Sequence, residues 1–351
     1  MQEVKKILVI RFRQIGDAVL ATALCNTLKQ SFPEAEIHFV LNKAISPLFE
    51  HHPAIDKIIT FDKEENKKTS LYFSKVWRVT HAAQYDVIID MRSTIRTLLF
   101  SLFSLHTPIR IGRAKWYSRF LHNNRIDNYN EKLSLDMVKR NQMLIAPLEK
   151  IRQITYTDKF DLGLSDKERT DFRTYMEIEG INFQYPVLLI GVTTKLEHKK
   201  WNVTRMTELL HNILSDYSTL QLIFNYAPGE EEKEAKQIYQ NLGSPQNIFI
   251  NIEAGSLREL IALCSNSSLY FGNEGGARHI AQAMNIPSFA IYSPNSSKST
   301  WLPQNSTQAE GIDPSDIISS KKLHSLSYEE QFSLLTVEEV YKRLKPLLDR
   351  L

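Results

Sequence analysis

Cysteine and long apolar runs are both scarce in this chain of 351 residues. Its two cysteines, Cys25 and Cys264, lie far apart, and each falls within an apolar, helix-like stretch. Buried thiols in a reducing compartment are therefore expected instead of a disulfide framework. No stretch approaches the roughly 20 apolar residues that a membrane-spanning helix needs, and the apolar run at 7–10 is too short for a signal peptide. We expect a cytoplasmic protein that is at most attached to a membrane surface.

Several nucleotide-binding and metal-binding motifs are also missing. The chain has no GxGxxG and no GxxxxGKS/T sequence, which argues against a nicotinamide dehydrogenase and a P-loop NTPase. No Cys and His spacing matches a zinc site, and no short DxD pair would hold a divalent ion on a diphosphate. No metal site and no cofactor is predicted. With a net charge of only +3, a dedicated nucleic-acid-binding protein is not expected either.

Short apolar runs rich in Val, Ile and Phe alternate with longer amphipathic stretches, which is the pattern of a parallel α/β sheet. In the first half, strands are expected at 7–11, 37–41, 58–61 and 87–90, and helices at 17–31, 70–83 and 92–104. Residues 106–165 are more irregular, with one helical pattern at 133–148. In the second half, strands are expected at 187–192, 220–225, 248–250, 269–271 and 289–292. Helical patterns occupy 203–215, 230–241, 256–264 and 276–284.

The predicted fold class is therefore α/β, with two doubly wound, Rossmann-like domains. Residues 1–165 would form the first domain and residues 166–330 the second. The amphipathic segment at 331–351 could cross back to pack on the first domain. A chain of this length commonly divides into two such cores. Because ligands of open α/β sheets bind beyond the carboxyl ends of the strands, the residues that follow each strand are the first candidates for a site.

The turn after the first strand carries charge and a glycine. It includes Arg11, Arg13 and Gln14, then Gly16, which allows a tight turn, and Asp17 at the mouth of the sheet. An arginine-rich turn at this edge favours an anion-binding or catalytic site. The alternative is that Asp17 merely caps the following helix. The local pattern alone does not separate the two.

The turn after the strand at 187–192 holds Thr193 and Thr194, and a Lys-Lys-Trp phrase begins at Lys199. Hydroxyl groups, backbone N–H groups and lysines can together bind a phosphate, because charge-assisted hydrogen bonds are the strong ones. A solvated basic loop is the alternative. The tryptophan of this phrase, Trp201, is more often a packing anchor than a ligand contact.

The most specific phrase is GNEGGARHIA, which directly follows the strand at 269–271. Gly275 and Gly276 open a helix whose first N–H groups and positive dipole end suit a diphosphate. Glu274 and His279 would flank this seat. A lone helical histidine is usually structural, so the position of His279 near the seat leaves both interpretations open.

Taken in order, these phrases resemble the ADP-heptose:lipopolysaccharide heptosyltransferase family, which is glycosyltransferase family 9. The family pattern Arg-x-x-x-x-Gly-Asp is matched at 11–17, Lys-x-x-Phe-Pro-x-Ala at 29–35, and Lys-x-Trp at 199–201. An Asp-Ser-Gly-x-x-His-x-Ala-like phrase and a later Gly-Pro are matched at 274–281 and 293–294, with departures. Glu274 replaces the usual Asp, Gly275 the usual Ser and Ser293 the usual Gly. These departures fall on the donor side, so they affect the sugar and nucleotide more than the reaction type.

The resemblance implies a GT-B glycosyltransferase, with two Rossmann-like domains facing a central cleft. The first domain would bind the acceptor and the second the sugar-nucleotide donor, with inversion at the anomeric carbon and no metal. On this reading Asp17 is the general base, and ADP-heptose is the favoured donor. The diphosphate would be held by Lys199, Thr193, Thr194, Gly275 and Gly276. Glu274 would contact the sugar or ribose, and Glu231 the nucleoside, although Glu230 and Glu232 compete for that role.

The acceptor is expected to be anionic, because the segment 91–126 contains seven Lys and Arg residues and no Asp or Glu. Arg92 and Arg96 are one helical turn apart just after the strand at 87–90, so both could face the acceptor. The expected acceptor-binding residues are Arg11, Arg13, Gln14, Gly16, Arg92 and Arg96. Aromatic residues interleave with the later cations, which could also rest this segment on the inner leaflet of the membrane. A solvated basic face is the alternative.

Two other functions share the expected architecture. A sugar-nucleotide epimerase or hydrolase needs the donor site but no acceptor, and a catalytically silent sugar-nucleotide-binding protein needs neither base nor acceptor. Donor turnover measured with and without an acceptor separates these from a glycosyltransferase that builds a surface glycolipid or polysaccharide.

Overall fold

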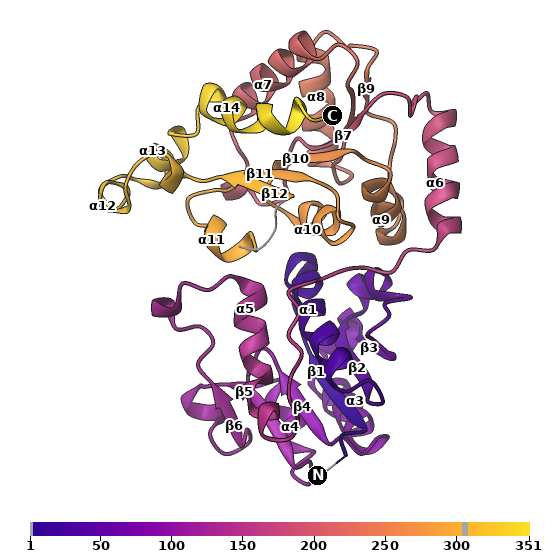
Figure 1. The fold of residues 1–351 in the computed structure, drawn as a ribbon, viewed down its shortest axis with the longest axis vertical. Helices are drawn as coiled ribbons and strands as arrows, with labels where there is room; N and C mark the ends of the chain where they lie inside the picture. Colours follow the sequence, from indigo (N-terminus) through magenta and orange to yellow (C-terminus); the bar gives the residue numbers. More distant parts are fainter. Residues whose placement is uncertain (1–2, 304–307) are drawn as a thin grey trace. The chain divides into compact units, whose positions relative to one another are not determined.

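A computed structural model describes residues 3–303 and 308–351. The chain divides into two compact units, Met1–Gly163 and Leu164–Leu351. Each unit is built on a parallel six-stranded sheet flanked by helices (Figure 1). The expected α/β class with two doubly wound sheets is confirmed.

In the first unit the strand order is β3-β2-β1-β4-β5-β6. The strands are β1 (Lys6–Ile10), β2 (Glu36–Asn42), β3 (Lys57–Phe61), β4 (Val87–Asp90), β5 (Ile109–Arg113) and β6 (Asn124–Ile126). The α-helices are α1 (Ile15–Ser31), α2 (Lys63–Lys67), α3 (Thr69–His81), α4 (Leu98–Leu102) and α5 (Met137–Gln142). Short 3-10 helices are η1 (Lys43–Phe49), η2 (Trp116–Ser118), η3 (Glu131–Leu133) and η4 (Met143–Lys150).

The second unit has the strand order β12-β11-β10-β7-β8-β9, which, read from its β9 edge, repeats the order of the first. The strands are β7 (Val187–Gly191), β8 (Gln221–Phe224), β9 (Ile248–Phe249), β10 (Leu269–Asn273), β11 (Ser288–Ile291) and β12 (Ala309–Ile312). The longer helices are α6 (Asp166–Ile178), α7 (Val203–Asp216), α8 (Glu230–Asn241), α9 (Leu257–Ser265), α10 (Gly276–Ala283) and α14 (Val337–Leu348). The shorter ones are η5 (Glu197–Lys199), α11 (Lys298–Trp301), η6 (Pro314–Asp316), α12 (Ser320–Leu323) and α13 (Tyr328–Ser333).

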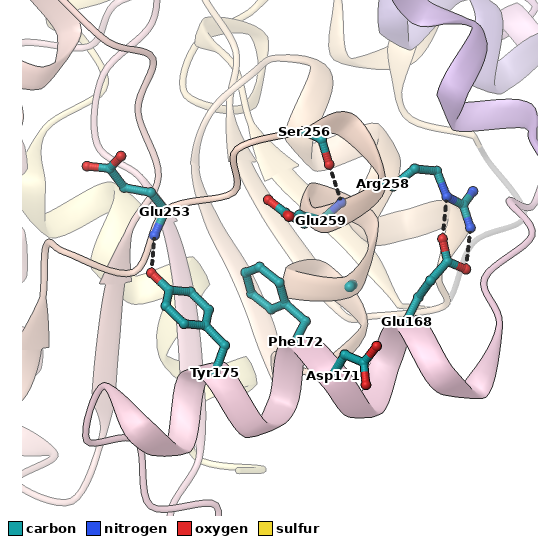
Figure 2. A pocket seen from close by; sticks show the side chains of 9 residues that line it. Glu168, Asp171, Phe172, Tyr175, Glu253, Ser256, Arg258 and Glu259 are labelled. Atoms are coloured by element: carbon teal, nitrogen blue, oxygen red, sulfur yellow. Dashed lines mark hydrogen bonds and ion pairs between the residues drawn. The ribbon is translucent and has the colours of Figure 1, made fainter.

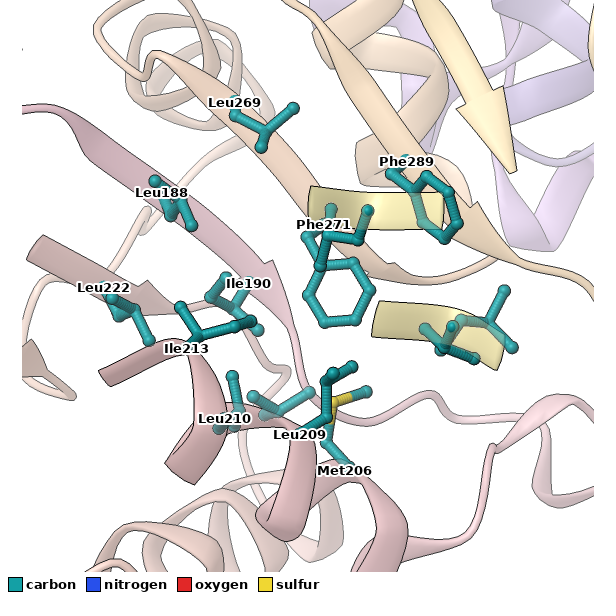
Figure 3. Packing of buried hydrophobic residues seen from close by; sticks show 14 of the residues in the cluster. Leu188, Ile190, Met206, Leu209, Leu210, Ile213, Leu222, Leu269, Phe271 and Phe289 are labelled. Atoms are coloured by element: carbon teal, nitrogen blue, oxygen red, sulfur yellow. The ribbon is translucent and has the colours of Figure 1, made fainter. Parts of the chain in front are cut away.

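The central strands are almost continuously apolar because helices cover both faces of a parallel sheet. Every residue of β4, β7 and β10 is buried. In the second unit, Ile190 and Phe271 project from β7 and β10 toward Met206 and Leu209 of α7 (Figure 3). This packing fixes the strand ends from which the candidate site residues project.

Three expectations about the elements were wrong. The helix expected at 92–104 is reduced to α4, because the carboxylate of Asp90 accepts hydrogen bonds from the backbone N–H groups of Arg92 and Ser93. Ser93 also has a positive φ of 48°, which a right-handed helix does not allow. Residues 106–165 contain two strands, β5 and β6, that the sequence pattern did not reveal. The helical pattern at 133–148 divides into α5 and η4.

The last helix, α14, belongs to the second unit. Its residues Val340, Leu344 and Leu347 are buried in the same apolar core as β7 and α7. The apolar face of this segment is therefore buried within its own unit.

Both cysteines are free and buried, as expected from the sequence. Burial disfavours the charged thiolate, which raises the pKa of Cys25 to about 12 and that of Cys264 further still. Among the described residues, no helix is long and apolar enough to cross a membrane.

Candidate active site

Each sheet has a switch point, where the strand order reverses beside its first strand. In the first unit this point lies between β1 and β4, and in the second unit between β7 and β10. Helices leave the sheet in opposite directions there, which opens a crevice at the carboxyl ends of the strands. Most of the residues singled out in the sequence follow one of these four strands.

At the first switch point, Arg11 and Asp17 form a close ion pair. Nη2 of Arg11 donates a hydrogen bond of 2.6 Å to Oδ1 of Asp17. Arg11 is 1% exposed and Asp17 is 8% exposed, so the pair is largely withdrawn from water. Nε of Arg13 lies 3.9 Å from the same carboxylate oxygen. Two guanidinium groups thus orient one carboxylate at the mouth of the sheet.

Asp17 does not cap the helix, which was the alternative interpretation. Helix α1 begins at Ile15, and its N-cap residue is Gln14, whose side chain makes no capping hydrogen bond. Asp17 lies one position beyond Gly16, within the first helical turn, and its carboxylate is turned to Arg11. The negative charge also suits the positive end of the helix dipole.

Arg92 and Arg96 line one cavity of about 520 Å³, although no helical turn joins them. The guanidinium of Arg92 donates to the carbonyl oxygen of Phe12, and that of Arg96 stacks over the ring of Tyr72 at 4.1 Å. Burial and the neighbouring Arg13 and Arg11 lower the pKa of Arg92. The other lining residues are Phe12, Asn66, Tyr72, Thr94, Ile95, Thr97 and Tyr117.

Arg113 extends this cationic region and was not singled out as a site residue in the sequence. Burial lowers its pKa, and the charges of Arg11 and Arg13 add to that effect. Its guanidinium lies 3.4 Å from the ring centre of Tyr129. It ends β5, a strand that was not predicted, so only the fold could bring it to this edge of the sheet.

In the second unit, Thr193 and Thr194 follow β7 and line a large cavity of about 1000 Å³. The hydroxyl of Thr193 donates a hydrogen bond of 2.5 Å to Oε2 of Glu234, and Nζ of Lys200 lies 2.8 Å from Oε1 of the same residue. Glu234 was not foreseen, because it comes from α8 and only the fold brings it to the end of β7. Its carboxylate fixes the position of the threonine beside the cavity.

Of the three glutamates at the start of α8, Glu231 differs from its neighbours. Glu230 pairs with Lys233, and Glu232 pairs with Lys236, each on the helix surface. Glu231 is half-buried in the wall of the 1000 Å³ cavity, and burial raises its pKa. Of these three glutamates, Glu231 is therefore the one whose carboxylate is partly desolvated and forms no ion pair with a lysine among the described residues.

Lys199 and Glu274 form the closest ion pair at the second switch point. Nζ of Lys199 lies 2.6 Å from Oε2 of Glu274, which also accepts a hydrogen bond of 3.0 Å from Ser296. The side chain of Glu274 is 6% exposed and that of Lys199 is 24% exposed. The lysine can therefore reach solvent, while the carboxylate that holds it cannot.

Helix α10 starts at Gly276, with Gly275 as an N-cap that supplies no side-chain hydrogen bond. Its first N–H groups face the same edge of the sheet as Glu274, which directly follows β10. Such an uncapped helix start carries partial positive charge that suits a phosphate.

His279 is buried one turn further along α10. Burial and the adjacent Arg278 and Lys199 lower the pKa of His279 well below 6.5, so the ring is neutral. The guanidinium of Arg278 donates to this ring at 2.8 Å and to the carbonyl oxygen of Trp301. His279 is thus held by a structural neighbour, and its ring is 2% exposed.

Asn273 and Trp201 fix the lysine loop to the sheet. Oδ1 of Asn273 accepts a hydrogen bond of 2.8 Å from the backbone N–H of Trp201. The indole N–H donates to the carbonyl oxygen of Leu335, and the ring is 1% exposed. Trp201 is therefore a packing anchor, and through it the position of Lys199 depends on the core.

A further cavity of about 440 Å³ lies between α6 and α9 (Figure 2). Four of its nine lining residues are acidic, and its arginine, Arg258, makes two hydrogen bonds of 2.7 Å to Glu168. The other acidic residues are Asp171, Glu253 and Glu259. Because like charges repel, this cavity does not suit a diphosphate, and none of the predicted site residues lines it.

Comparison with known proteins identifies the family. Residues 73–330, more than half of the chain, match the profile of glycosyltransferase family 9 (heptosyltransferase). The chain belongs to glycosyltransferase family 9. The family 9 enzyme is 22% identical over 292 residues to lipopolysaccharide heptosyltransferase 1 of Campylobacter coli, covering 82% of this chain and 83% of that protein.

Solved structures agree on the fold of the family 9 enzyme. The glycosyl transferase family 9 protein from Veillonella parvula DSM 2008 superimposes with a TM-score of 0.84 at 18% identity, covering 100% of this chain and 99% of that one. ADP-heptose lps heptosyltransferase II of E. coli gives a TM-score of 0.74 at 21% identity, covering 98% and 99%. These likenesses confirm the GT-B-like α/β architecture, and the family establishes that the protein is a glycosyltransferase.

Proposed function

We propose that this enzyme transfers a heptose from ADP-heptose to an anionic surface glycolipid or polysaccharide, with inversion at the anomeric carbon and without a metal ion. The observation that carries the proposal is the pairing of charged residues at both switch points. The Arg11–Asp17 pair lies at one and the Lys199–Glu274 pair at the other. The names of the two heptosyltransferase relatives support the choice of donor and of a lipopolysaccharide-type acceptor.

In this mechanism Asp17 is the general base. Its carboxylate takes the proton of the acceptor hydroxyl as the oxygen attacks the anomeric carbon of the donor sugar. The bond between that carbon and the diphosphate oxygen breaks on the opposite face, so the configuration inverts and ADP leaves. Arg11 keeps the carboxylate in position, and the hydrogen bond of 2.6 Å supports this role.

In this proposal the cations of the first unit bind the acceptor. The negative groups of the acceptor would bind Arg92 and Arg96 in the 520 Å³ cavity, together with Arg13 beside Asp17. Gln14 and Gly16 would shape the turn on which Asp17 sits. The planar guanidinium suits carboxylate and phosphate groups because it binds them through paired hydrogen bonds.

Charge that develops on the departing diphosphate would be offset in the second unit. Lys199 would leave Glu274 and pair with a phosphate, while the N–H groups at Gly275 and Gly276 bind the other oxygens. Thr193 and Thr194 would donate hydroxyl hydrogen bonds from the end of β7. Preformed donors of this kind stabilise the transition state without reorganising water.

The remaining donor contacts follow from burial and position. Glu231 would accept hydrogen bonds from the ribose of the nucleoside, since it is partly desolvated in the wall of the 1000 Å³ cavity. Glu274, once released by Lys199, would accept hydrogen bonds from sugar hydroxyl groups. His279 would stabilise the start of α10 as a neutral ring.

Donor turnover with and without an acceptor tests this function. The purified protein is incubated with ADP-heptose, UDP-glucose or GDP-mannose, each with and without a heptose-deficient lipopolysaccharide core. We expect ADP release and a product heavier by one heptose only with ADP-heptose and the acceptor together. Release without acceptor would indicate a hydrolase, isomerised donor an epimerase, and thermal stabilisation by a donor without turnover a silent binding protein.

A further inference from the structure

Three large apolar side chains on the segments that contribute to the wall of the acceptor cavity are largely exposed. Trp116 is 83% exposed, and Ile95 and Phe120 are each 76% exposed. Ile95 lines the 520 Å³ cavity, as does Tyr117, the neighbour of Trp116. Exposed apolar side chains gathered around one site usually mark an interaction surface.

The loop that carries two of these residues is firmly anchored. The hydroxyl of Ser118, a buried residue, donates to the carbonyl oxygen of Arg113, and the hydroxyl of Tyr117 donates to that of Ser93. Arg110 donates to the carbonyl oxygens of Leu121, Leu105 and Thr107. Trp116 and Phe120 therefore project into water from a fixed backbone.

Among the residues that the structure describes, the cations of the segment 91–126 have no ion pair with a carboxylate. Within residues 3–303 and 308–351, none of these seven side chains lies within 4.0 Å of a carboxylate oxygen. They are Arg92, Arg96, Arg110, Arg113, Lys115, Arg119 and Arg125. Arg92, Arg96 and Arg113 lie at or near the cavity, whereas Arg119 and Arg125 are exposed. The unpaired charge on this rim matches an extended anionic surface better than one small ligand.

We propose that Trp116 and Phe120, with Ile95, Lys115, Arg119 and Arg125, form a docking surface for an anionic lipid bilayer. Tryptophan and phenylalanine beside cations are suited to the region of the lipid headgroups, where the rings enter the apolar layer and the charges face phosphates. The guanidinium of Arg119 lies 4.5 Å from the ring centre of Phe120, which brings a charge and an apolar ring to the same point.

Docking in this way would place the acceptor cavity at the membrane surface. A glycolipid acceptor could then reach Arg92 and Arg96 with its sugars while its acyl chains stay in the bilayer. The inference adds a surface to the proposed function, but lipid binding itself requires neither donor nor transfer. Its failure is therefore distinguishable from a failure of the proposed reaction.

Sedimentation with vesicles tests the docking surface. The full chain is mixed with vesicles of phosphatidylcholine alone or with an equal share of phosphatidylglycerol, and the bound fraction is measured. We expect binding to the anionic vesicles. Removal of each Lys or Arg close to the surface should weaken this binding about fivefold. Lys115→Gln/Arg119→Gln should therefore bind about 25-fold more weakly, and high salt should act in the same direction.

An apolar variant and a matched control distinguish vesicle binding through the docking surface from nonspecific binding through any exposed apolar side chain. Trp116→Ser/Phe120→Ser should weaken binding to anionic vesicles at least about tenfold, since two exposed rings no longer enter the bilayer. Ile178→Ser removes a side chain that is 77% exposed on α6 of the other unit, and it should leave binding unchanged. Transfer to a water-soluble core oligosaccharide should be unaffected in both variants.

Three results would overturn the docking surface. They are no binding to anionic vesicles, equal binding to neutral vesicles, or an equal loss of vesicle binding in Trp116→Ser/Phe120→Ser and in Ile178→Ser. Sedimentation velocity supplies a further arm without lipid. If the wild-type chain self-associates and Trp116→Ser/Phe120→Ser makes it monomeric, the surface is an interface between protein copies and the bilayer assignment is wrong.

Discussion

Nη2 of Arg11 lies 2.6 Å from Oδ1 of Asp17, and the two residues are 1% and 8% exposed. A carboxylate held by one guanidinium and approached by a second, that of Arg13, has a fixed direction. Such an arrangement suits a base that must meet one hydroxyl, but it would equally serve as a structural ion pair. A substitution that keeps the hydrogen bond and removes the charge distinguishes these roles.

Asp17→Asn should lower turnover by about 10²–10⁴-fold, the usual contribution of a general base, while the donor Kd stays within about twofold of wild type. Asparagine retains an oxygen that accepts from Arg11, so folding should survive. Steady-state kinetics and calorimetric ADP titration measure the two effects. Asp62→Asn is the control, because Asp62 caps α2 and asparagine caps equally well. Unchanged turnover in Asp17→Asn would assign Asp17 to structure alone.

Lys199→Ala should weaken donor binding and slow transfer about 10²-fold, since a cation is lost where negative charge develops. It should also lower the free energy of unfolding by about 1–3 kcal/mol, because the buried carboxylate of Glu274 loses its partner. Lys199→Ala/Glu274→Gln should regain that stability without regaining activity. Thermal unfolding and donor kinetics measure both. Lys195→Ala, in the same loop, should do much less, and equal effects would remove the special role of Lys199.

Arg96→Ala should raise the acceptor KM about 10–100-fold and leave the donor KM unchanged, because a charge-assisted hydrogen bond to an anionic acceptor is lost. Arg92→Ala should act likewise, although it also removes a hydrogen bond to the carbonyl of Phe12. Arg78→Ala, an exposed arginine on α3, is the control. Added salt should raise the acceptor KM of the wild type. A neutral acceptor that works equally well would contradict an acidic acceptor.

Activity should persist in the presence of EDTA. In the proposed mechanism Lys199 and the start of α10 offset the charge of the leaving diphosphate, so no divalent ion is required. Initial rates are compared after dialysis against EDTA, with and without added magnesium or manganese. Complete loss of activity that either ion restores would show that a metal takes part.

Stability should fall as the pH drops below about 6.5, and His279 should contribute to that fall. Burial lowers the pKa of His279 in the folded protein far below its unfolded value of 6.5. Below 6.5 the unfolded chain therefore binds a proton that the folded chain does not, which favours unfolding by up to about 1.4 kcal/mol per pH unit. Above that pH the group contributes nothing to the pH dependence.

Thermal unfolding between pH 7.5 and 5.5 checks the contribution of His279. His279→Asn keeps an acceptor for Arg278 and should give a shallower decline with falling pH, even if its stability at pH 7.5 is lower. His324→Asn alters an exposed histidine and should keep the wild-type slope. Parallel slopes in the wild type and His279→Asn would contradict the neutral, buried state of His279.

The sequence pattern predicts most of the strands but misses β5, β6 and β12, for a physical reason. Inner strands such as β4 and β7 are buried on both faces, so they are short runs of Val, Ile and Leu. The edge strands β6 and β12 are only partly buried and contain Arg125 and Glu310, so their composition resembles that of loops. The helix expected at 92–104 failed because side-chain hydrogen bonds from Asp90 compete with helical ones.

Candidate site residues that follow a strand could be identified from the sequence, because the fold class alone places them at the edge of the sheet. Thr193 and Glu274 are examples. Other residues of the site could not be identified in this way. Glu234 reaches Thr193 from α8, and Arg113 ends a strand that has no clear sequence pattern. Which side chain meets which depends on strand order and register, and no local pattern encodes these.

The burial of Cys25 and Cys264 has a practical consequence for labelling. Thiol reagents attack the thiolate, and burial makes the thiolate of both residues inaccessible and unfavourable. A cysteine introduced at an exposed position such as 116 would therefore be the reactive thiol of the native protein. A spin label or fluorophore can be attached at one chosen point without first replacing the native cysteines.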